Sequence, residues 1–328
     1  MKNKPSIALS IQKYLDSVAQ SRNVNTARTY RYALTKIFSE NVLTKHHLPI
    51  DSHTISELPE EAIAWLASSL KDKSPATERL CLTAVYGFYE YLVAERMAEI
   101  NLPRLRLLIR QRARRLGQRL PQFPRNDIEL LLDYAFNLAQ INVETEVEQL
   151  RNLRDRAFLI TLADTGLRVH EACQLRRGDI DWNEARAIII GKGDRQAVVR
   201  FSNRSLKALK DYLSARLPFD GKSGRPLPSL PLFARHDKGA GKKVKPITTT
   251  TGRNIVNQRV IEVLGMSAVG RITPHSFRHY FVTTVLQSSG NLKLAQELAR
   301  HKNISVTQRY AHLSDDELDK GYWEIFDQ

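Results

Sequence analysis

The sequence predicts a mainly α-helical protein with a small β-sheet, in which an all-helical N-terminal domain precedes a larger, mostly helical α+β domain. Its length of 328 residues favours two domains over one. Apolar residues recur at helical spacing through most of the chain. One stretch, ARAIIIGKGDRQAVVRF at 185–201, contains two β-rich runs joined by a hairpin signal. We therefore expect domains at 1–103 and 126–328, joined by a linker at 104–125.

Four amphipathic segments make up the expected N-terminal domain. In SIALSIQKYLDSVAQ, at 6–20, one face carries Ile7, Ile11, Tyr14, Leu15 and Val18. The other segments lie at 25–40, 59–70 and 74–96, and the last opens with a Ser-Pro pair that is typical of a helix start. A bundle of about four helices is the simplest packing for them.

The expected linker concentrates the positive charge of the chain, whose net charge of +15 favours a polyanionic partner. Residues 1–100 carry 12 Lys or Arg against 11 Asp or Glu, whereas residues 101–125 carry 8 against none. Prolines at 121 and 124 forbid a continuous helix there. Either the segment is a solvated charged helix, or it is an arm that lies along a phosphate backbone and makes binding strongly salt-dependent. The candidate phosphate-binding residues are Arg104, Arg106, Arg110, Arg112, Arg114, Arg115 and Arg119.

The expected second domain is mostly helical. Beside the hairpin, helical patterns lie at 127–140, 153–166, 248–265, 273–290 and 291–301. Residues 220–247 are rich in Gly, Pro and Lys, which predicts a long loop or excursion. An amphipathic segment at 314–328 follows the last of these patterns.

Several classes of protein and site are disfavoured by composition. No apolar stretch is long enough to span a membrane and the N-terminus is not signal-like, so we expect a cytoplasmic protein. Cys81 and Cys173 are too few for a disulfide framework and are expected in the core. His275 and His279 have a metal-ligand spacing, but Arg278 lies between them and no glutamate accompanies them, so we expect no metal site.

Two cationic helix starts suggest an anion site. In the first, Thr165 is expected to cap a helix with Arg168 at its third position. In the second, Thr273 caps a helix whose first turn or so contains His275 and Arg278. Each cation opposes the helix dipole by roughly 0.3–1 kcal/mol. The free N–H groups of both helix starts would suit one phosphate held from two sides.

Purely structural roles remain open for these residues. Arg168 and Arg278 would be structural if they bridge to acids such as Glu171 or Asp179. Tyr310, in HKNISVTQRYAHL at 301–313, would then be one more aromatic residue packed between helices.

Three blocks taken together resemble the tyrosine recombinases, also called the integrase family of phage, Xer and integron enzymes. They are TGLRVHE at 165–171, HSFRH at 275–279 and LARHKNISVTQRYAHL at 298–313. Their order and spacing resemble the family's combination of R-x-x-E, H-x-x-R and a histidine nine residues before a tyrosine. The resemblance covers roughly residues 7–328. It implies a helical, SAM-like core-binding domain, a basic linker, and a catalytic domain with a C-terminal exchange helix.

The resemblance also implies roles for individual residues. Arg168 and Arg278 match the arginines that clamp the non-bridging oxygens of the scissile phosphate. His275 and His301 match the histidines that hydrogen-bond this phosphate and assist proton transfer. Glu171 matches an acidic residue that orients the arginines.

The remaining matches concern the bonds that are made and broken. Tyr310 matches the nucleophile, and Lys192 matches the β-hairpin lysine that acts as general acid for the leaving 5′ oxygen. The chain departs from the family pattern at Arg300, where glycine is usual, and at His170, where serine is common. Neither departure removes a catalytic group.

The implied function is site-specific DNA recombination through a 3′-phosphotyrosine intermediate, with no metal, cofactor or ATP. The implied partner is double-stranded DNA, bound as a homotetramer on two duplexes, with a monomer or weak dimer off DNA and no membrane association. Two alternatives are a catalytically idle DNA-binding protein of the same fold and a type IB topoisomerase that relaxes DNA as a monomer. A Mg²⁺-dependent transposase fits least, because no acidic cluster stands out.

Overall fold

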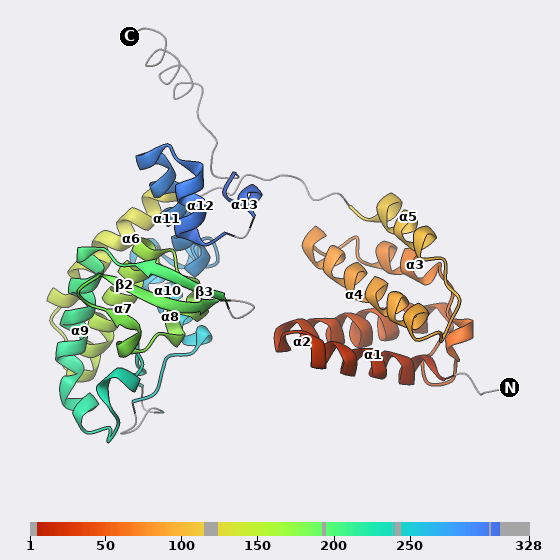
Figure 1. The fold of residues 1–328 in the computed structure, drawn as a ribbon, viewed down its shortest axis with the longest axis horizontal. Coiled ribbons are helices and arrows are strands. Elements are labelled where there is room, and N and C mark those ends of the chain that lie inside the picture. The colour runs from red at the N-terminus through yellow and green to blue at the C-terminus, as the bar shows by residue number, and fades with distance from the viewer. Residues whose placement is uncertain are drawn as a thin grey trace, which may run out of the picture. The chain divides into compact units, whose positions relative to one another are not determined.

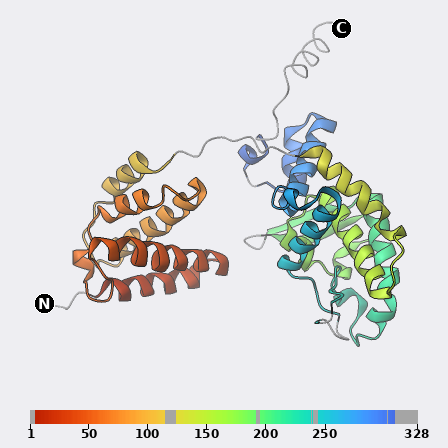
Figure 2. The same cartoon turned by 180° about the vertical axis from the view of Figure 1, so that it is seen from behind.

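Two separate hydrophobic cores divide the chain. The computed structural model describes residues 5–114, 124–191, 195–237, 239, 244–301 and 303–308. The chain separates into units Met1–Arg119 and Leu120–Gln328, each built around a core of its own (Figure 1). A view from behind shows the helical first unit and the mixed second unit (Figure 2). The predicted fold class, mainly helical with a small sheet, is confirmed.

The four helical segments expected in the first unit are present. The helices are α1 (Ile7–Ser21), α2 (Val24–Tyr32) with its π-helical continuation Ala33–Leu43, α3 (Ala62–Ser69), α4 (Pro75–Ala94) and α5 (Leu102–Arg112). Ser6 caps α1 by accepting a hydrogen bond from Leu9 N at 3.2 Å, and Ser74 caps α4 in front of Pro75. All five residues of the apolar face expected for α1 are buried.

The first part of the expected linker is instead the fifth helix of this unit. Residues 102–112 form α5, which begins at Asn101 as N-cap and contacts α3 and α4. Leu105 is fully buried in the core. The prolines at 121 and 124 follow this helix, so they do not prevent it. The expectation of a linker from 104 onward was therefore wrong for its first half.

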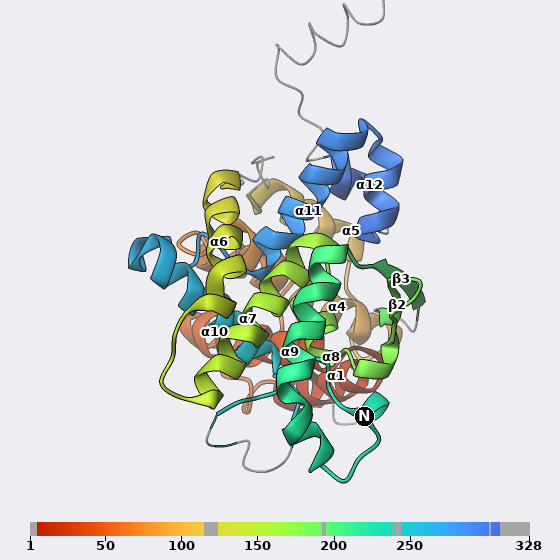
Figure 3. The ribbon, with the colours of Figure 1, turned by 90° about the vertical axis from the view of Figure 1, so that its left-hand side faces the viewer.

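The second unit combines helices with a three-stranded sheet. Its helices are α6 (Arg125–Asn137), α7 (Glu146–Thr165), α8 (Val169–Gln174), α9 (Asn203–Gly221), α10 (Thr249–Leu264), α11 (Pro274–Ser289), α12 (Leu292–Ala299) and α13 (Ile304–Gln308). Figure 3 looks onto this unit with α9 in front. α7 is buried along most of its length and contacts both α9 and α11. No helix in the described ranges is long and apolar enough to cross a membrane.

The predicted hairpin is the main part of the sheet. Strands β1 (Ile180–Asp181), β2 (Arg186–Gly191) and β3 (Arg195–Arg200) are antiparallel in the order β1-β2-β3. The register places Ile188 opposite Val198. Both Cys81 and Cys173 are buried and free, which confirms them as core residues.

The segment expected as a loop excursion is partly core. Leu230, Leu232, Phe233 and Ala234 are buried within 220–247. Buried Arg216 donates hydrogen bonds to the carbonyls of residues 231 and 232, at 2.8 and 3.0 Å. These bonds satisfy two carbonyls of a segment whose strand-like pairing, among the described residues, consists of isolated bridges at Pro231 and Ala234. The helix that carries Arg216, α9, was not among the predicted segments.

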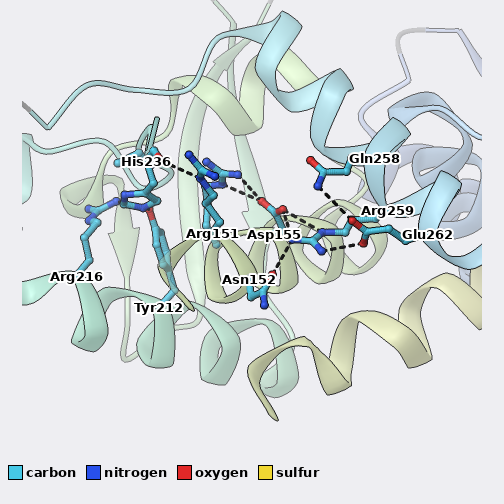
Figure 4. A network of polar contacts seen from close by, with 11 residues as sticks. Arg151, Asn152, Asp155, Tyr212, Arg216, His236, Gln258, Arg259 and Glu262 are labelled. Carbon is cyan, nitrogen blue, oxygen red and sulfur yellow. Dashed lines mark hydrogen bonds and ion pairs between the residues drawn. The ribbon is translucent and has the colours of Figure 1, made fainter. Parts of the chain in front are cut away.

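Figure 4 shows a buried polar network that joins α7 to α10. Arg259 on α10 donates to Asp155 Oδ2 at 2.8 Å, to Asn152 Oδ1 at 2.8 Å and to Glu262 at 2.8 Å. Burial opposes the charge, but Asp155 and Glu262 together raise the pKa of Arg259 above its ordinary value. The network therefore fixes α7 and α10 relative to each other.

Candidate functional site

Arg168 lies at the start of α8, but not in the expected position. Thr165 is the last residue of α7 rather than an N-cap, because Gly166 ends that helix in the left-handed conformation at φ 59°. Arg168 is the N-cap of α8, and Glu171 takes the third helical position. An acid rather than a cation thus faces the free N–H groups of this helix start, so the expected Thr165 cap was wrong.

Gly166 brings this turn close to α11. A Cβ atom there would lie 2.5 Å from Phe281 Cδ1, and the positive φ also disfavours any side chain. The close approach allows the Gly166 carbonyl to accept a hydrogen bond from Arg278 Nη1 at 2.5 Å. A glycine is therefore required for the contact between the two segments.

Arg278 ties together the segments that carry the other candidate residues. α11 begins as predicted, with residue 273 as N-cap and Pro274 first. The Arg278 side chain is 2% exposed and also donates through Nη2 to Ala299 O. Gly166 precedes Arg168 by two residues, and Ala299 precedes His301 by two. One buried guanidinium thus joins the start of α8 to the turn after α12.

Glu171 is a buried carboxylate shared by two arginines. Its side chain is 4% exposed. It accepts from Arg168 N at 2.8 Å, from Arg168 Nη1 at 2.9 Å and from Arg300 Nη2 at 3.4 Å. Burial opposes its charge, but these hydrogen bonds and the two guanidinium charges lower the pKa of Glu171 below its ordinary value. The ion pair between Arg168 and Glu171, left open as a structural alternative, is present.

His275 and His279 lie one turn apart on α11. Their rings are 4.4 Å apart between centroids and almost perpendicular. Partial desolvation and then the charges of Arg278 and Arg168 lower the pKa of His275. Desolvation, followed by His275 and Arg278, lowers the pKa of His279 to about 4. Both rings are therefore neutral at pH 7.

His301 follows α12 and is anchored at both its backbone and its ring. Its N–H donates to Gln296 O at 3.0 Å, and Nδ1 lies 2.9 Å from the hydroxyl of buried Thr307. Desolvation, then the charges of Arg278 and Arg168, lower the pKa of His301 to about 4. A neutral imidazole held in one orientation can accept a proton.

Sequence reasoning missed three supporting groups. The Gly166 carbonyl carries no signal beyond the glycine itself, which was seen only as part of a motif. Thr307 contacts His301 across a turn and a short helix, a spacing that no periodicity predicts. Arg300 was noted only as a departure from glycine, yet its guanidinium lies against Glu171.

The candidate arginines of α5 are partly neutralised within their own unit. Arg104 pairs with Glu60 at 2.8 Å and with Glu61 at 2.5 Å. Arg106 donates to a tyrosine hydroxyl at 2.6 Å and pairs with Glu90 at 3.4 Å. Their contacts indicate that both residues stabilise the docking of α5.

Arg114 is also engaged, whereas two arginines of α5 have no acidic partner among the described residues. Arg114 Nε pairs at 2.6 Å with Glu78, whose side chain is 1% exposed. Burial opposes the Glu78 charge, but the hydrogen bonds from Arg114 and Lys71 lower its pKa. Arg110 and Arg112 are exposed and make no ion pair with any residue that the structure describes. Among the described candidates, these two have no acidic partner, so their charge is available to a polyanion.

The other candidate residues, Tyr310, Lys192, Arg115 and Arg119, lie outside the described residues. Within the described ranges, no three His, Cys, Asp or Glu side chains come together in a group that could hold a metal ion.

Solved structures share the fold. The XerH site-specific recombinase bound to difH substrate in a pre-cleavage complex matches with a TM-score of 0.65 and 20% identity, over 94% of this chain and 83% of that one. The Tn1549 transposon integrase in complex with transposon right end DNA matches with a TM-score of 0.65 and 18% identity, over 97% and 99% of the two chains.

Sequence comparison gives the family. Residues 132–317 match the model of the phage integrase family. The tyrosine recombinase XerC of Pediococcus pentosaceus is 30% identical over 247 residues, which cover 75% of this chain and 74% of the relative. XerC of Treponema denticola is 28% identical over 322 residues, 95% and 96% of the two chains. The chain therefore belongs to the phage integrase family, the family of the tyrosine recombinases.

Proposed function

We propose that this tyrosine recombinase cuts and rejoins double-stranded DNA at a specific site, with Tyr310 as nucleophile and without metal, cofactor or ATP. The observation that carries the proposal is the placement of Arg278. Its guanidinium holds the carbonyls that precede Arg168 and His301, so three segments that carry candidate phosphate ligands are joined at one place. A motif match alone would not require these segments to meet.

The charges of this cluster of candidate residues suit phosphoryl transfer. Arg168 and Arg278 supply fixed positive charge for the non-bridging oxygens, which gain charge in the transition state. Desolvation, followed by the charges of these two arginines, lowers the pKa of His275 and His301, so both rings are neutral before DNA binds. A neutral His301 can accept the phenolic proton of Tyr310, which would otherwise remain bound at neutral pH.

The proposed step conserves bond energy. The Tyr310 oxygen bonds to phosphorus as its proton leaves, and the bond between phosphorus and the 5′ oxygen breaks. Lys192 donates a proton to that oxygen, which leaves as a 5′ hydroxyl. A 5′ hydroxyl from a second strand then reverses the step, releases Tyr310 and restores a phosphodiester. Strand exchange thus requires no external energy source.

In this proposal the two units have different roles. The first unit binds the core of the DNA site, and exposed Arg110 and Arg112 contact its phosphates. The second unit carries the chemistry. The XerH and Tn1549 neighbours are themselves DNA complexes, which supports DNA as the partner. We further propose a homotetramer on two duplexes, which forms from a monomer or weak dimer when DNA binds.

Covalent capture tests the proposal. The protein is incubated, in EDTA and without ATP, with a library of nicked duplexes whose flanks are randomised, so that cleavage releases a short fragment and traps the adduct. We expect an SDS-stable protein–DNA adduct that is lost in Tyr310→Phe. A protein that binds duplexes and forms no adduct would instead be an idle DNA-binding protein. Relaxation of supercoiled DNA by a monomer, without strand exchange, would favour the topoisomerase.

A further inference from the structure

Arg300 follows α12 in a backbone conformation that favours glycine. Its φ is 58°, in the left-handed region, where a side chain is strained. The tyrosine recombinases usually have glycine at this position, so this chain retains an arginine where the backbone disfavours one. A residue held in this region is a pointer to function when its side chain has a defined task.

The Arg300 side chain is 10% exposed and reaches the segment between α7 and α8. Nη2 lies 3.2 Å from Gly166 O and 3.4 Å from Glu171 Oε2. Nη1 lies 3.4 Å from Thr165 O and 3.3 Å from Leu298 O. Each hydrogen bond is long, so the guanidinium acts mainly through its charge and its several simultaneous acceptors.

Two of these acceptors also hold the candidate phosphate ligands. Gly166 O accepts from Arg278 Nη1 at 2.5 Å. Glu171 accepts from the backbone N–H and the guanidinium of Arg168, at 2.8 and 2.9 Å. Arg300 therefore contacts both the carbonyl that holds Arg278 and the carboxylate that holds Arg168.

We propose that Arg300 is a positioning residue that neutralises Glu171 while Arg168 turns to the scissile phosphate, and that fixes the Gly166 carbonyl behind Arg278. The inference rests on the proposed function and deepens it. The Arg168 side chain is 43% exposed and can turn outward, whereas Arg300 is enclosed. Without Arg300, the buried carboxylate would lose its remaining guanidinium when Arg168 engages DNA. The loss would fall on the cleavage step rather than on DNA binding.

The test compares Arg300→Gly and Arg300→Lys with the unaltered protein in single-turnover cleavage of a duplex recovered from the capture library. Glycine accepts the positive φ, so the first variant removes the side chain without backbone strain. We expect Arg300→Gly to cleave on the order of 10- to 100-fold more slowly, as when outer partners of other site ligands are removed. DNA affinity should change little, and Arg300→Lys should recover a large part of the rate. Arg259→Met, which removes a buried guanidinium outside the site, controls for lost stability.

The pH profile of cleavage provides a readout that a purely structural role would not move. Among the described residues, the charged and titratable groups that face His301 are Arg278 and His275 from α11, Arg168 from the start of α8, and Arg300 beside it. Removal of the Arg300 charge should raise the apparent pKa that governs the acidic limb of the profile of cleavage rate against pH. Arg300→Lys should leave this limb in place.

The outcomes separate the two proposals. If the unaltered protein forms no adduct, the proposed function fails and the role of Arg300 fails with it. If the unaltered protein cleaves and Arg300→Gly cleaves equally fast with the same acidic limb, only the role of Arg300 is overturned. Equal losses in Arg300→Gly, Arg300→Lys and Arg259→Met, in parallel with lower melting temperatures, would also overturn it.

Discussion

Glu171→Gln removes the charge that pairs with two guanidinium groups, Arg168 at the start of α8 and Arg300 after α12. The carboxylate is 4% exposed and accepts three hydrogen bonds, two from Arg168 and one from Arg300. The amide can present one oxygen, so at least one of these donors faces an N–H group instead. Breaking a buried ion pair costs about 3 kcal/mol or more. We expect a loss of about 3 kcal/mol in the free energy of unfolding of the second unit at pH 7.

The pH dependence of this loss has a definite sign. The folded state lowers the pKa of Glu171 below 4.5, so the carboxylate contributes stability above that pH. The contribution disappears as the pH falls through the lowered pKa. The difference between the wild type and the glutamine variant should therefore be full at pH 7 and should shrink in acid.

Urea unfolding followed by Trp182 fluorescence measures this difference. Trp182 packs against the core of the second unit, and Trp65→Phe with Trp323→Phe removes the other two tryptophans of the chain. Glu262→Gln is the matched control, because that side chain is 31% exposed and should cost about 1 kcal/mol. A loss for Glu171→Gln no larger than the control, or one that grows in acid, would contradict a stabilising role for the charged Glu171 carboxylate.

Three further predictions concern charge. Arg110→Gln with Arg112→Gln should weaken DNA binding and reduce the slope of log K against log salt by about 2, with the melting temperature unchanged; salt titration by fluorescence anisotropy checks this. Arg114→Ala should instead destabilise the first unit by about 3 kcal/mol, because buried Glu78 loses its main partner; urea unfolding checks it, and an unchanged midpoint would contradict it. The free-protein pKa of His301 should be near 4 by NMR titration and should rise when a phosphodiester binds; a value above 6 would contradict the desolvated cationic pocket.

Local sequence signals predicted several helix faces and helix starts, because the causes of these features are local. The face of α1 and the Ser74-Pro75 start of α4 follow from periodicity and capping alone. The wrong cap at Thr165 shows the limit of such signals. Thr-Gly-Leu-Arg can start a helix or end one, and the choice depends on the close packing of Gly166 against Phe281.

Charge runs were harder to predict, because composition does not show which charges are paired. The arginines of α5 look alike in sequence and are all exposed, yet Arg104 pairs with acids more than forty residues away, while Arg110 pairs with no acid among the described residues. The burial of residues 230–234 likewise depends on Arg216 of the preceding helix, whose donors satisfy carbonyls of this segment. In the site, the family motif supplied the residue identities. That Arg278 joins three segments could be seen only in the structure.

The most direct test of the account is to identify the residue that carries DNA in the trapped adduct. After nuclease trimming and trypsin digestion, mass spectrometry should find a nucleotide linked through its 3′ phosphate to the peptide that begins at Tyr310 and ends at Lys320. The same adduct should form in EDTA and should be absent from Tyr310→Phe. Attachment at another residue, a 5′ linkage, or an undiminished adduct in Tyr310→Phe would contradict the account.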